Sequence, residues 1–283
     1  MKRKDFRPKK RFGQHFLYDP AIAAKIVDAS GVGQEDTVVE LGAGKGILTK
    51  PLSERDARII ALEVDRTLCE ELARQFEGNG DGHDRAAAKV EVLNVDFTKI
   101  SLTGLLAARN LERCVLMGNI PYNLTREVLF SFLVDEYEII ESAFLMLQKE
   151  VGDRIVSPPG SRVYGITSVI LQSFYSIQPV LKVAPGSFSP RPKVASVVLS
   201  FKPLPEPLVE PGELKQFIGL VKNLFQQRRK TIHNTLKTAY ELPEMALKKI
   251  HAATGINLQR RPEELSNLAF LQISRSLAEV TKV

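Results

Sequence analysis

The strongest constraint on the fold is a regular alternation of short apolar segments with longer amphipathic ones through the first half of the chain. The apolar segments are rich in Val, Ile and Leu, and they cover residues 37–41, 59–63, 90–95, 114–118 and 143–147. Runs of this length and composition predict strands that are buried on both faces. The intervening segments predicted as helices are residues 47–55, 66–77, 101–110 and 124–135. Strands that alternate with helices indicate an α/β domain with a parallel sheet and right-handed crossovers.

The pattern changes toward the C-terminus. Residues 169–183 and 194–201 are predicted to be two further strands without a long helix between them, which suggests an antiparallel pair at the edge of the sheet. Residues 203–213 contain four prolines and are expected to form a stiff linker. Apolar spacing then predicts helices at residues 214–227, 229–239, 243–253 and 262–281. We therefore expect an α/β domain at residues 1–202, the linker, and a small all-α domain at residues 214–283.

Positive charge is concentrated at the two ends of the chain. Residues 1–15, a basic N-terminal arm, contain seven Lys and Arg against one Asp. Residues 214–283 contain twelve Lys and Arg against five Glu, whereas the segment between them is net negative. Two basic regions favour a polyanion such as nucleic acid as the partner. Two solvated basic faces are the alternative interpretation.

Several classes of protein are disfavoured by the composition. The chain has no run of 18 apolar residues, and its basic N-terminus lacks an apolar core, so we expect neither a membrane span nor a signal peptide. Cys69 and Cys114 are isolated, which argues against a disulfide framework and suits a cytoplasmic location. The four histidines lack ligand spacing, so we expect no metal site.

A glycine-rich segment, Gly42-Ala43-Gly44-Lys45-Gly46, directly follows the first predicted strand. Glycines are needed where a chain turns sharply from strand to helix while a ligand lies against its backbone. The dinucleotide fingerprint would require glycine at position 47, which is Ile47, and the phosphate-binding loop motif is also absent. The segment therefore suits a cofactor without a pyrophosphate, such as S-adenosylmethionine. A tight turn without a ligand is the alternative.

Acidic residues mark the ends of the second and third predicted strands. Glu63 ends the second strand, 21 residues after Gly42, close to the spacing at which a carboxylate binds ribose hydroxyls. Asp96 follows the third strand and is placed to accept from an adenine amino group, although a helix cap is an equally good explanation for it alone. Ligands of open α/β sheets bind at these strand ends, so the features together predict a nucleoside-containing cofactor there.

The most specific chemical signal is Asn119-Ile120-Pro121-Tyr122, directly after the fourth strand. The exocyclic amine of adenine is a poor nucleophile because its lone pair is conjugated into the ring. The side-chain oxygen of Asn119 and a backbone carbonyl, expected to be that of Ile120, can each accept one N–H and turn the lone pair toward a methyl donor. Pro121 stiffens the loop, and Tyr122 offers a ring on which a base can stack. The motif predicts catalysis by positioning, with an asparagine-capped turn as the alternative.

At these residues the chain resembles the ribosomal RNA adenine dimethyltransferase family, and most of all the bacterial branch that acts on the small ribosomal subunit. The resemblance extends over nearly the whole chain. The matching segments are residues 11–17, 40–46, 119–122, 146–151, 188–194 and 227–231. It implies a Rossmann-like, seven-stranded class I methyltransferase domain followed by a small helical domain. It also implies transfer of two methyl groups from S-adenosylmethionine to N6 of each of two adjacent adenosines near the 3′ end of 16S RNA, during ribosome assembly.

The resemblance further implies roles for individual residues. The cofactor contacts are expected on His15, Leu17, Gly42, Gly44, Glu63, Asp96 and Asn119. Phe188 is expected to close over the other face of the target base, although an aromatic in this position is more often part of a core. Arg228, Arg229 and Lys230 are expected to contact ribosomal RNA from the helical domain, with a solvated helix face as the alternative. We expect a monomer that binds the small ribosomal subunit.

Three other functions share part of this pattern. An Erm-type enzyme methylates one adenine of large-subunit RNA with nearly the same core motifs. A non-catalytic RNA-binding assembly factor would be expected to lose the glycine loop or Asn119, and both are intact. A DNA adenine methyltransferase would carry a proline in place of Ile120.

Overall fold

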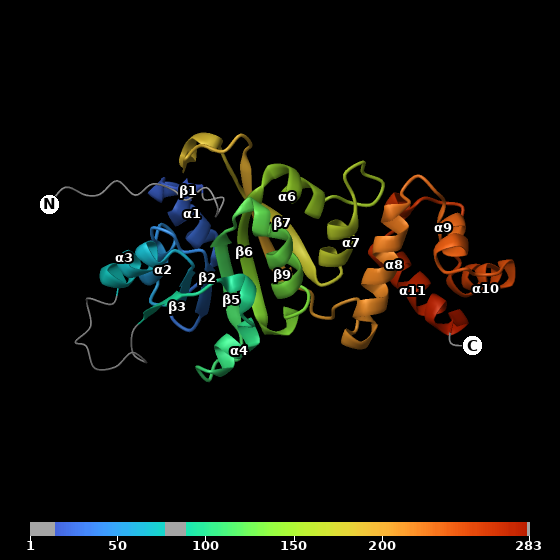
Figure 1. Cartoon of the computed structure of the whole chain (residues 1–283), viewed down its shortest axis with the longest axis horizontal. Helices are drawn as coiled ribbons and strands as arrows, with labels where there is room; N and C mark the ends of the chain where they lie inside the picture. The colour runs from blue at the N-terminus through green and yellow to red at the C-terminus, as the bar shows by residue number, and fades with distance from the viewer. Residues whose placement is uncertain (1–14, 77–88, 282–283) are drawn as a thin grey trace. The chain divides into compact units, whose positions relative to one another are not determined.

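A parallel sheet is the framework of the first part of the chain (Figure 1). The computed structural model describes residues 15–76 and 89–281, so the basic arm expected before residue 15 lies outside the described residues. These residues form a seven-stranded sheet in the order β4-β3-β2-β5-β6-β9-β7. Its strands are β2 (Thr37–Leu41), β3 (Arg58–Glu63), β4 (Val90–Asn94), β5 (Cys114–Asn119), β6 (Ile140–Gln148), β7 (Tyr175–Val183) and β9 (Ser196–Pro203).

The strand pairing confirms the expected α/β architecture. Strands β4, β3, β2, β5 and β6 pair in parallel, and β9 runs antiparallel to β6. All five strands expected in the parallel part of the sheet are present. The connecting helices are α2 (Thr49–Ser53), α3 (Arg66–Phe76), α4 (Leu102–Ala107) and α5 (Thr125–Glu127), which leads into a π-helical turn at Val128–Phe132. None of the helices in the described ranges combines the length and the hydropathy needed to cross a bilayer.

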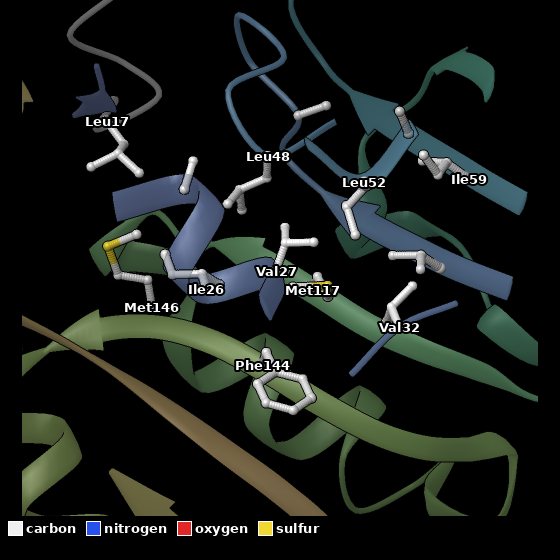
Figure 2. Close-up of a cluster of buried hydrophobic side chains, with 14 of the residues drawn as sticks. Leu17, Ile26, Val27, Val32, Leu48, Leu52, Ile59, Met117, Phe144 and Met146 are labelled. Atoms are coloured by element: carbon white, nitrogen blue, oxygen red, sulfur yellow. The ribbon is translucent and has the colours of Figure 1, made fainter. Parts of the chain in front are cut away.

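Helix α1 (Pro20–Ser30) covers part of one face of the sheet, and the sequence analysis did not predict it. Its start is well defined, because the Asp19 side chain accepts from the backbone of Ala21 at 3.0 Å and Pro20 occupies the first turn. Figure 2 shows Val27 of α1 beside Met117 of β5. Helix α1 thus packs onto the central strands through buried apolar contacts.

One predicted strand is partly wrong. The strand expected at residues 169–183 begins only at Tyr175, as β7. The residues before it belong to helix α7 (Ile166–Gln172). The side chains of Val169, Ile170 and Leu171 are all fully buried. A short continuous apolar run is compatible with either a buried helix or a buried strand, so composition alone could not separate the two.

Contacts divide the chain into two compact units. The first comprises Met1–Gly152 and Gln178–Lys202, and the second comprises Asp153–Ile177 and Pro203–Val283. The second unit contains α8 (Leu214–Gln226), α9 (Ile232–Ala239), α10 (Glu244–Thr254) and α11 (Asn267–Thr281), in agreement with the four expected helices. It also contains residues 153–177, which the sequence analysis had assigned to the α/β domain.

A buried tyrosine explains why this segment groups with the helices. Tyr164 is fully buried, and its hydroxyl donates to the carbonyl of Leu265 at 3.1 Å and lies 2.7 Å from Oδ1 of Asn267. Its ring meets that of Phe225 edge-on at 6.1 Å, and Phe225 stacks on Phe270. The aromatic cluster therefore joins the loop before α7 to helices α8 and α11.

We expect Tyr164→Phe to lower the free energy of unfolding of the second unit by about 1–3 kcal/mol, because it leaves buried acceptors without their donor. Tyr240→Phe is a matched control, since the Tyr240 hydroxyl is half-buried and accepts a single hydrogen bond, from Asn223 at 3.0 Å. Denaturant unfolding of both variants measures the difference. Equal destabilisation would contradict the role given to Tyr164.

Candidate active site

A cavity of about 210 Å³ opens where the parallel strands of the sheet end. Its walls come from the segments that follow β2, β3, β4 and β5, together with the residues at and just before strand β1 (Phe16–Leu17). The lining residues are His15, Phe16, Gly42, Gly44, Glu63, Val64, Asp96, Phe97, Thr98 and the run from Asn119 to Leu124. The carboxyl edge of an open parallel sheet is where such folds bind ligands. The structure thus brings segments that are far apart in sequence to one cavity.

The glycine loop has a backbone that other residues would not adopt readily. Gly42, Gly44 and Gly46 all have positive φ angles, of 68°, 59° and 77°. A Cβ atom at Gly44 would lie 3.2 Å from the ring of Phe16, and one at Gly46 would lie 2.6 Å from Leu72. The glycines therefore allow the loop to turn tightly between the cavity and α3.

Glu63 holds the glycine loop in place as well as facing the cavity. Its side chain is 3% exposed, and its two oxygens accept from the backbone of Gly44 at 2.8 Å and of Asp65 at 2.7 Å. Burial raises the pKa of Glu63, and the backbone hydrogen bonds partly oppose that shift. Each carboxylate oxygen has a second lone pair, so Glu63 can also accept from ligand hydroxyls.

Asp96 combines the two roles considered for it. It caps the short 3-10 helix Phe97–Lys99, because its Oδ1 accepts from the backbone of Thr98 at 3.1 Å and from the Thr98 hydroxyl at 2.6 Å. Hydrogen bonding from Thr98 lowers the pKa of Asp96. Since Asp96 also lines the cavity, it presents an ionised carboxylate there at neutral pH.

Asn119, the last residue of β5, is oriented by the backbone of the residue directly before β1. Its Nδ2 donates to the carbonyl of His15 at 2.9 Å. Its Oδ1 has no hydrogen-bond partner within residues 15–76 and 89–281. Next to it, the backbone N–H of Ile120 donates to Met146 at 3.2 Å, which ties the loop to β6. The carboxamide is thus held by its nitrogen, and its oxygen remains able to accept.

Tyr122 is fixed at both its ring and its hydroxyl. The hydroxyl lies 3.1 Å from Oγ of Ser196, a buried residue at the start of β9. The ring lies 5.5 Å from the His15 ring, with a tilt of 32°. These contacts hold a half-buried aromatic ring in the cavity wall, where a planar ligand could stack on it.

Known proteins of similar sequence identify the family of this chain. The profile of the family described as "Ribosomal RNA adenine dimethylase" matches residues 5–279. A protein of Geobacter metallireducens named "Ribosomal RNA small subunit methyltransferase A" is 41% identical over 278 residues, which cover 98% of each chain. The chain belongs to the ribosomal RNA adenine dimethylase family.

Two solved structures share the fold of this chain. A dimethyladenosine transferase from Plasmodium falciparum superposes with a TM-score of 0.76 at 24% identity, covering 95% of this chain and 98% of its own. The 23S rRNA methyltransferase ErmE superposes with a TM-score of 0.67 at 22% identity, covering 93% of this chain and 99% of its own. The expected class I methyltransferase fold with a C-terminal helical part is therefore confirmed.

Most of the site residues predicted for this member of the dimethylase family line the cavity. They are His15, Gly42, Gly44, Glu63, Asp96, Asn119, Ile120, Pro121 and Tyr122. The sequence analysis missed Phe16, Val64, Phe97, Thr98, Asn123 and Leu124. Each of these lies within two residues of a predicted one, so proximity to the motifs was the available signal. Among the described residues, no group of His, Cys, Asp and Glu is arranged to hold a metal ion.

Leu17 and Phe188 are not among the residues that line the cavity, so their expected contacts with the cofactor and the target base stay predictions. Strand β1 pairs antiparallel with β8 (Phe188–Ser189), with Leu17 opposite Phe188 and Phe16 opposite Ser189. Side chains alternate across a strand, so Phe16 faces the cavity while Leu17 and Phe188, both 3% exposed, join the hydrophobic core. Phe188 therefore packs as a core residue, which is the alternative considered for it in the sequence.

The basic cluster predicted to contact RNA belongs to the second unit. Arg229 and Lys230 are exposed. Arg228 is half-buried, and it donates to the carbonyl of Arg162 at 2.7 Å and lies 3.6 Å from a carboxylate oxygen of Glu263. One member of the cluster therefore helps to hold the loop before α7, and the other two present their side chains to solvent.

A second buried carboxyl group lies beneath the glycine loop. Glu40 of β2 is 1% exposed, and its Oε2 accepts from the Thr49 hydroxyl at 2.6 Å. Burial, helped by the negative charge of the nearby Glu63 and opposed by the hydrogen bond from Thr49, raises the pKa of Glu40 to about 8. Glu40 is therefore mostly protonated at neutral pH, and it joins the start of α2 to the strand that precedes the loop.

We expect Glu40→Gln to change how stability depends on pH. In the wild type the folded pKa is about 8 against an unfolded value of 4.5, so stability falls as pH rises between these values. Glutamine keeps the acceptor for Thr49 and does not ionise. The free energy of unfolding of the variant should rise relative to that of the wild type from pH 5 to pH 8, by on the order of a few kcal/mol. Above pH 9 this difference should stay constant. Denaturant unfolding at several pH values measures this, and a difference that is the same at all of them would refute it.

Proposed function

We propose that this protein transfers methyl groups from S-adenosylmethionine to N6 of two adjacent adenosines near the 3′ end of 16S RNA, giving N6,N6-dimethyladenosine during ribosome assembly. The main support for this proposal is the orientation of the Asn119 carboxamide. Asn119 is held by its amide nitrogen in the cavity wall while its oxygen remains able to accept an N–H. This is the arrangement that an adenine amine requires, in a chain that belongs to the ribosomal RNA adenine dimethylase family.

The residues around the cavity fit the cofactor. Glu63 has acceptor capacity for ribose hydroxyls, and Asp96 offers a carboxylate to an adenine amino group. Gly42 and Gly44 keep the loop free of side chains where a ligand would lie against the backbone. Main-chain atoms of His15 and Leu17 are proposed as further contacts, since the Leu17 side chain is in the core. When bound, S-adenosylmethionine supplies a methyl group on a positively charged sulfur.

The residues of the motif act mainly by positioning. We propose that Asn119 Oδ1 and the Ile120 carbonyl accept the two N–H groups of the target adenine and turn the nitrogen lone pair out of the ring plane. The Tyr122 ring stacks on the base, and Pro121 limits the movement of the loop. No strong base is needed, because the alkylated amine is acidic and loses its proton to water. Holding the reacting atoms in line supplies most of the rate enhancement.

The small subunit is the proposed partner, on the basis of the names of the relatives. The Geobacter metallireducens protein is named for the small subunit, whereas the likeness to ErmE is below 25% identity and concerns the fold. We propose that exposed Arg229 and Lys230 contact ribosomal RNA, and that the protein acts in the cytoplasm as a monomer. Arg228 would support this contact through the loop that it holds.

Transfer of labelled methyl groups to three substrates tests the proposal. The substrates are unmethylated small ribosomal subunits, large-subunit RNA and duplex DNA. Two methyl groups on each of two adjacent adenosines of the small subunit are expected. Label in large-subunit RNA would indicate an Erm-type enzyme instead. RNA binding without any transfer would indicate an assembly factor that lacks catalysis.

We expect Asn119→Ala to lower kcat about 100-fold or more, because the target amine loses one of its two acceptors and the site loses its preorganisation. The fold should persist, since Asn119 is at the end of β5 and its side chain makes a single hydrogen bond to His15. Single-turnover transfer measures the rate, and denaturant unfolding is the control. Turnover at the wild-type rate would rule out the positioning role.

We expect Glu63→Gln to weaken cofactor binding about 10-fold, because the amide replaces one acceptor oxygen with a donor that faces the backbone N–H of Gly44 or Asp65. Calorimetric titration with S-adenosylmethionine measures the affinity. An unchanged Kd in a correctly folded variant would argue against ribose binding by Glu63.

A further inference from the structure

A short basic segment is fastened at both ends to residues of the cavity wall. We call residues 190–195 the rim loop. At its start, the carbonyl of Pro190 accepts from Nδ1 of His15 at 2.7 Å. Directly after its end, the Ser196 hydroxyl lies 3.1 Å from that of Tyr122. His15 and Tyr122 both line the cavity, so the rim loop must run along its edge.

The rim loop is also stiff. Its last residue, Ala195, accepts through its carbonyl from the backbone of Lys149 at 2.9 Å. The side chain of Pro192 is buried, and the prolines at 190 and 192 restrict the backbone further. The loop therefore holds its exposed side chains in a defined place beside the cavity.

Two of these exposed side chains are positively charged. Arg191 and Lys193 alternate with the prolines, and both face solvent. Neither makes an ion pair with another residue of the described ranges, and residues 186–195 contain no Asp or Glu. By contrast, Arg109 is paired with Glu91 at 2.6 Å. The charges of the rim loop are thus available to an anionic ligand.

We propose that Arg191 and Lys193 form a phosphate-binding subsite for the RNA backbone beside the target adenosine. The inference rests on the proposed function, because it takes the ligand of the cavity to be a base of RNA. Only the base of the target nucleotide has to reach Asn119 and Tyr122 in the cavity, whereas the sugar-phosphate chain that carries it continues outside. The flanking phosphates must therefore stay at the rim, next to Pro190 and its neighbour Arg191.

The subsite offsets the free energy needed to expose the target base. A base that reacts inside a cavity must first leave its stack, which is unfavourable. Phosphate contacts from Arg191 and Lys193 favour the RNA conformation in which the base points inward. They act on binding and leave the reacting atoms to Asn119 and Tyr122.

The test compares single charge removals at the two ends of the same strand. Arg191→Gln and Lys193→Gln alter the rim loop just before β9, whereas Lys202→Gln alters an exposed lysine near the other end of β9 (Ser196–Pro203). Lys202 lies six residues after Ser196 along the strand, or about 20 Å away. Each substitution removes one positive charge, so the control corrects for the change in net charge.

The measurements are methyl transfer to unmethylated small subunits, the salt dependence of RNA binding, and calorimetric cofactor affinity. Each rim-loop variant should raise KM for RNA about 3- to 10-fold and lower the salt slope by about 0.7, with kcat and the cofactor Kd unchanged. Lys202→Gln should match the wild type. In the double variant Arg191→Gln/Lys193→Gln, the fold-changes in KM should multiply and the decreases in salt slope should add.

The outcomes separate this proposal from the proposed function. If the wild type transfers methyl groups and the rim-loop variants match Lys202→Gln, the subsite is refuted while the function stands. If the wild type transfers to no RNA, the function fails, and the salt slope of RNA binding still decides the subsite. A KM change with intact subunits but none with the isolated RNA segment would also overturn it, because the loop would then contact a ribosomal protein.

Discussion

The parallel register of β4, β3, β2 and β5 is the constraint on which the site depends. Because these strands run in the same direction, their carboxyl ends meet at one edge, and each end delivers a different group. The end of β2 gives the glycine loop, β3 gives Glu63, the turn after β4 gives Asp96, and β5 gives Asn119. Hydrogen bonds from Gly44 to Glu63 and from Asn119 to His15 then fix these groups to one another.

Burial gives this edge of the sheet an unusual electrostatic character. Two glutamates on neighbouring strands, Glu40 and Glu63, are almost entirely removed from solvent, and burial raises the pKa of each. Glu40 is held by Thr49, and Glu63 by two backbone N–H groups. Because protonated Glu40 is neutral, it adds no second negative charge next to Glu63. The carboxyl groups of Glu40 and Glu63 can therefore both be buried beneath the glycine loop without repelling each other as two negative charges.

The sequence was sufficient for the parts of the site that follow directly from strand ends. The glycine loop, Glu63, Asp96 and Asn119-Ile120-Pro121-Tyr122 are local motifs, and a parallel sheet is enough to bring them together. Features that depend on distant pairing were not predictable. The pairing of Leu17 with Phe188 joins two short strands about 170 residues apart, and it turned both side chains into the core. The helical state of residues 166–172 depends on burial around Tyr164, which the local sequence does not specify.

The pairing of β1 with β8 also has a consequence for how the molecule forms during translation. A nascent chain that has emerged as far as β6 already contains every residue that lines the cavity. It still lacks Phe188–Pro190, which hold Phe16 and His15 against the cavity. Domains generally fold as units, so the N-terminal segment must wait for the end of the first unit before it can dock. The catalytic pocket is therefore completed late in synthesis, and chains truncated before this segment would carry the motif without the frame that orients Asn119.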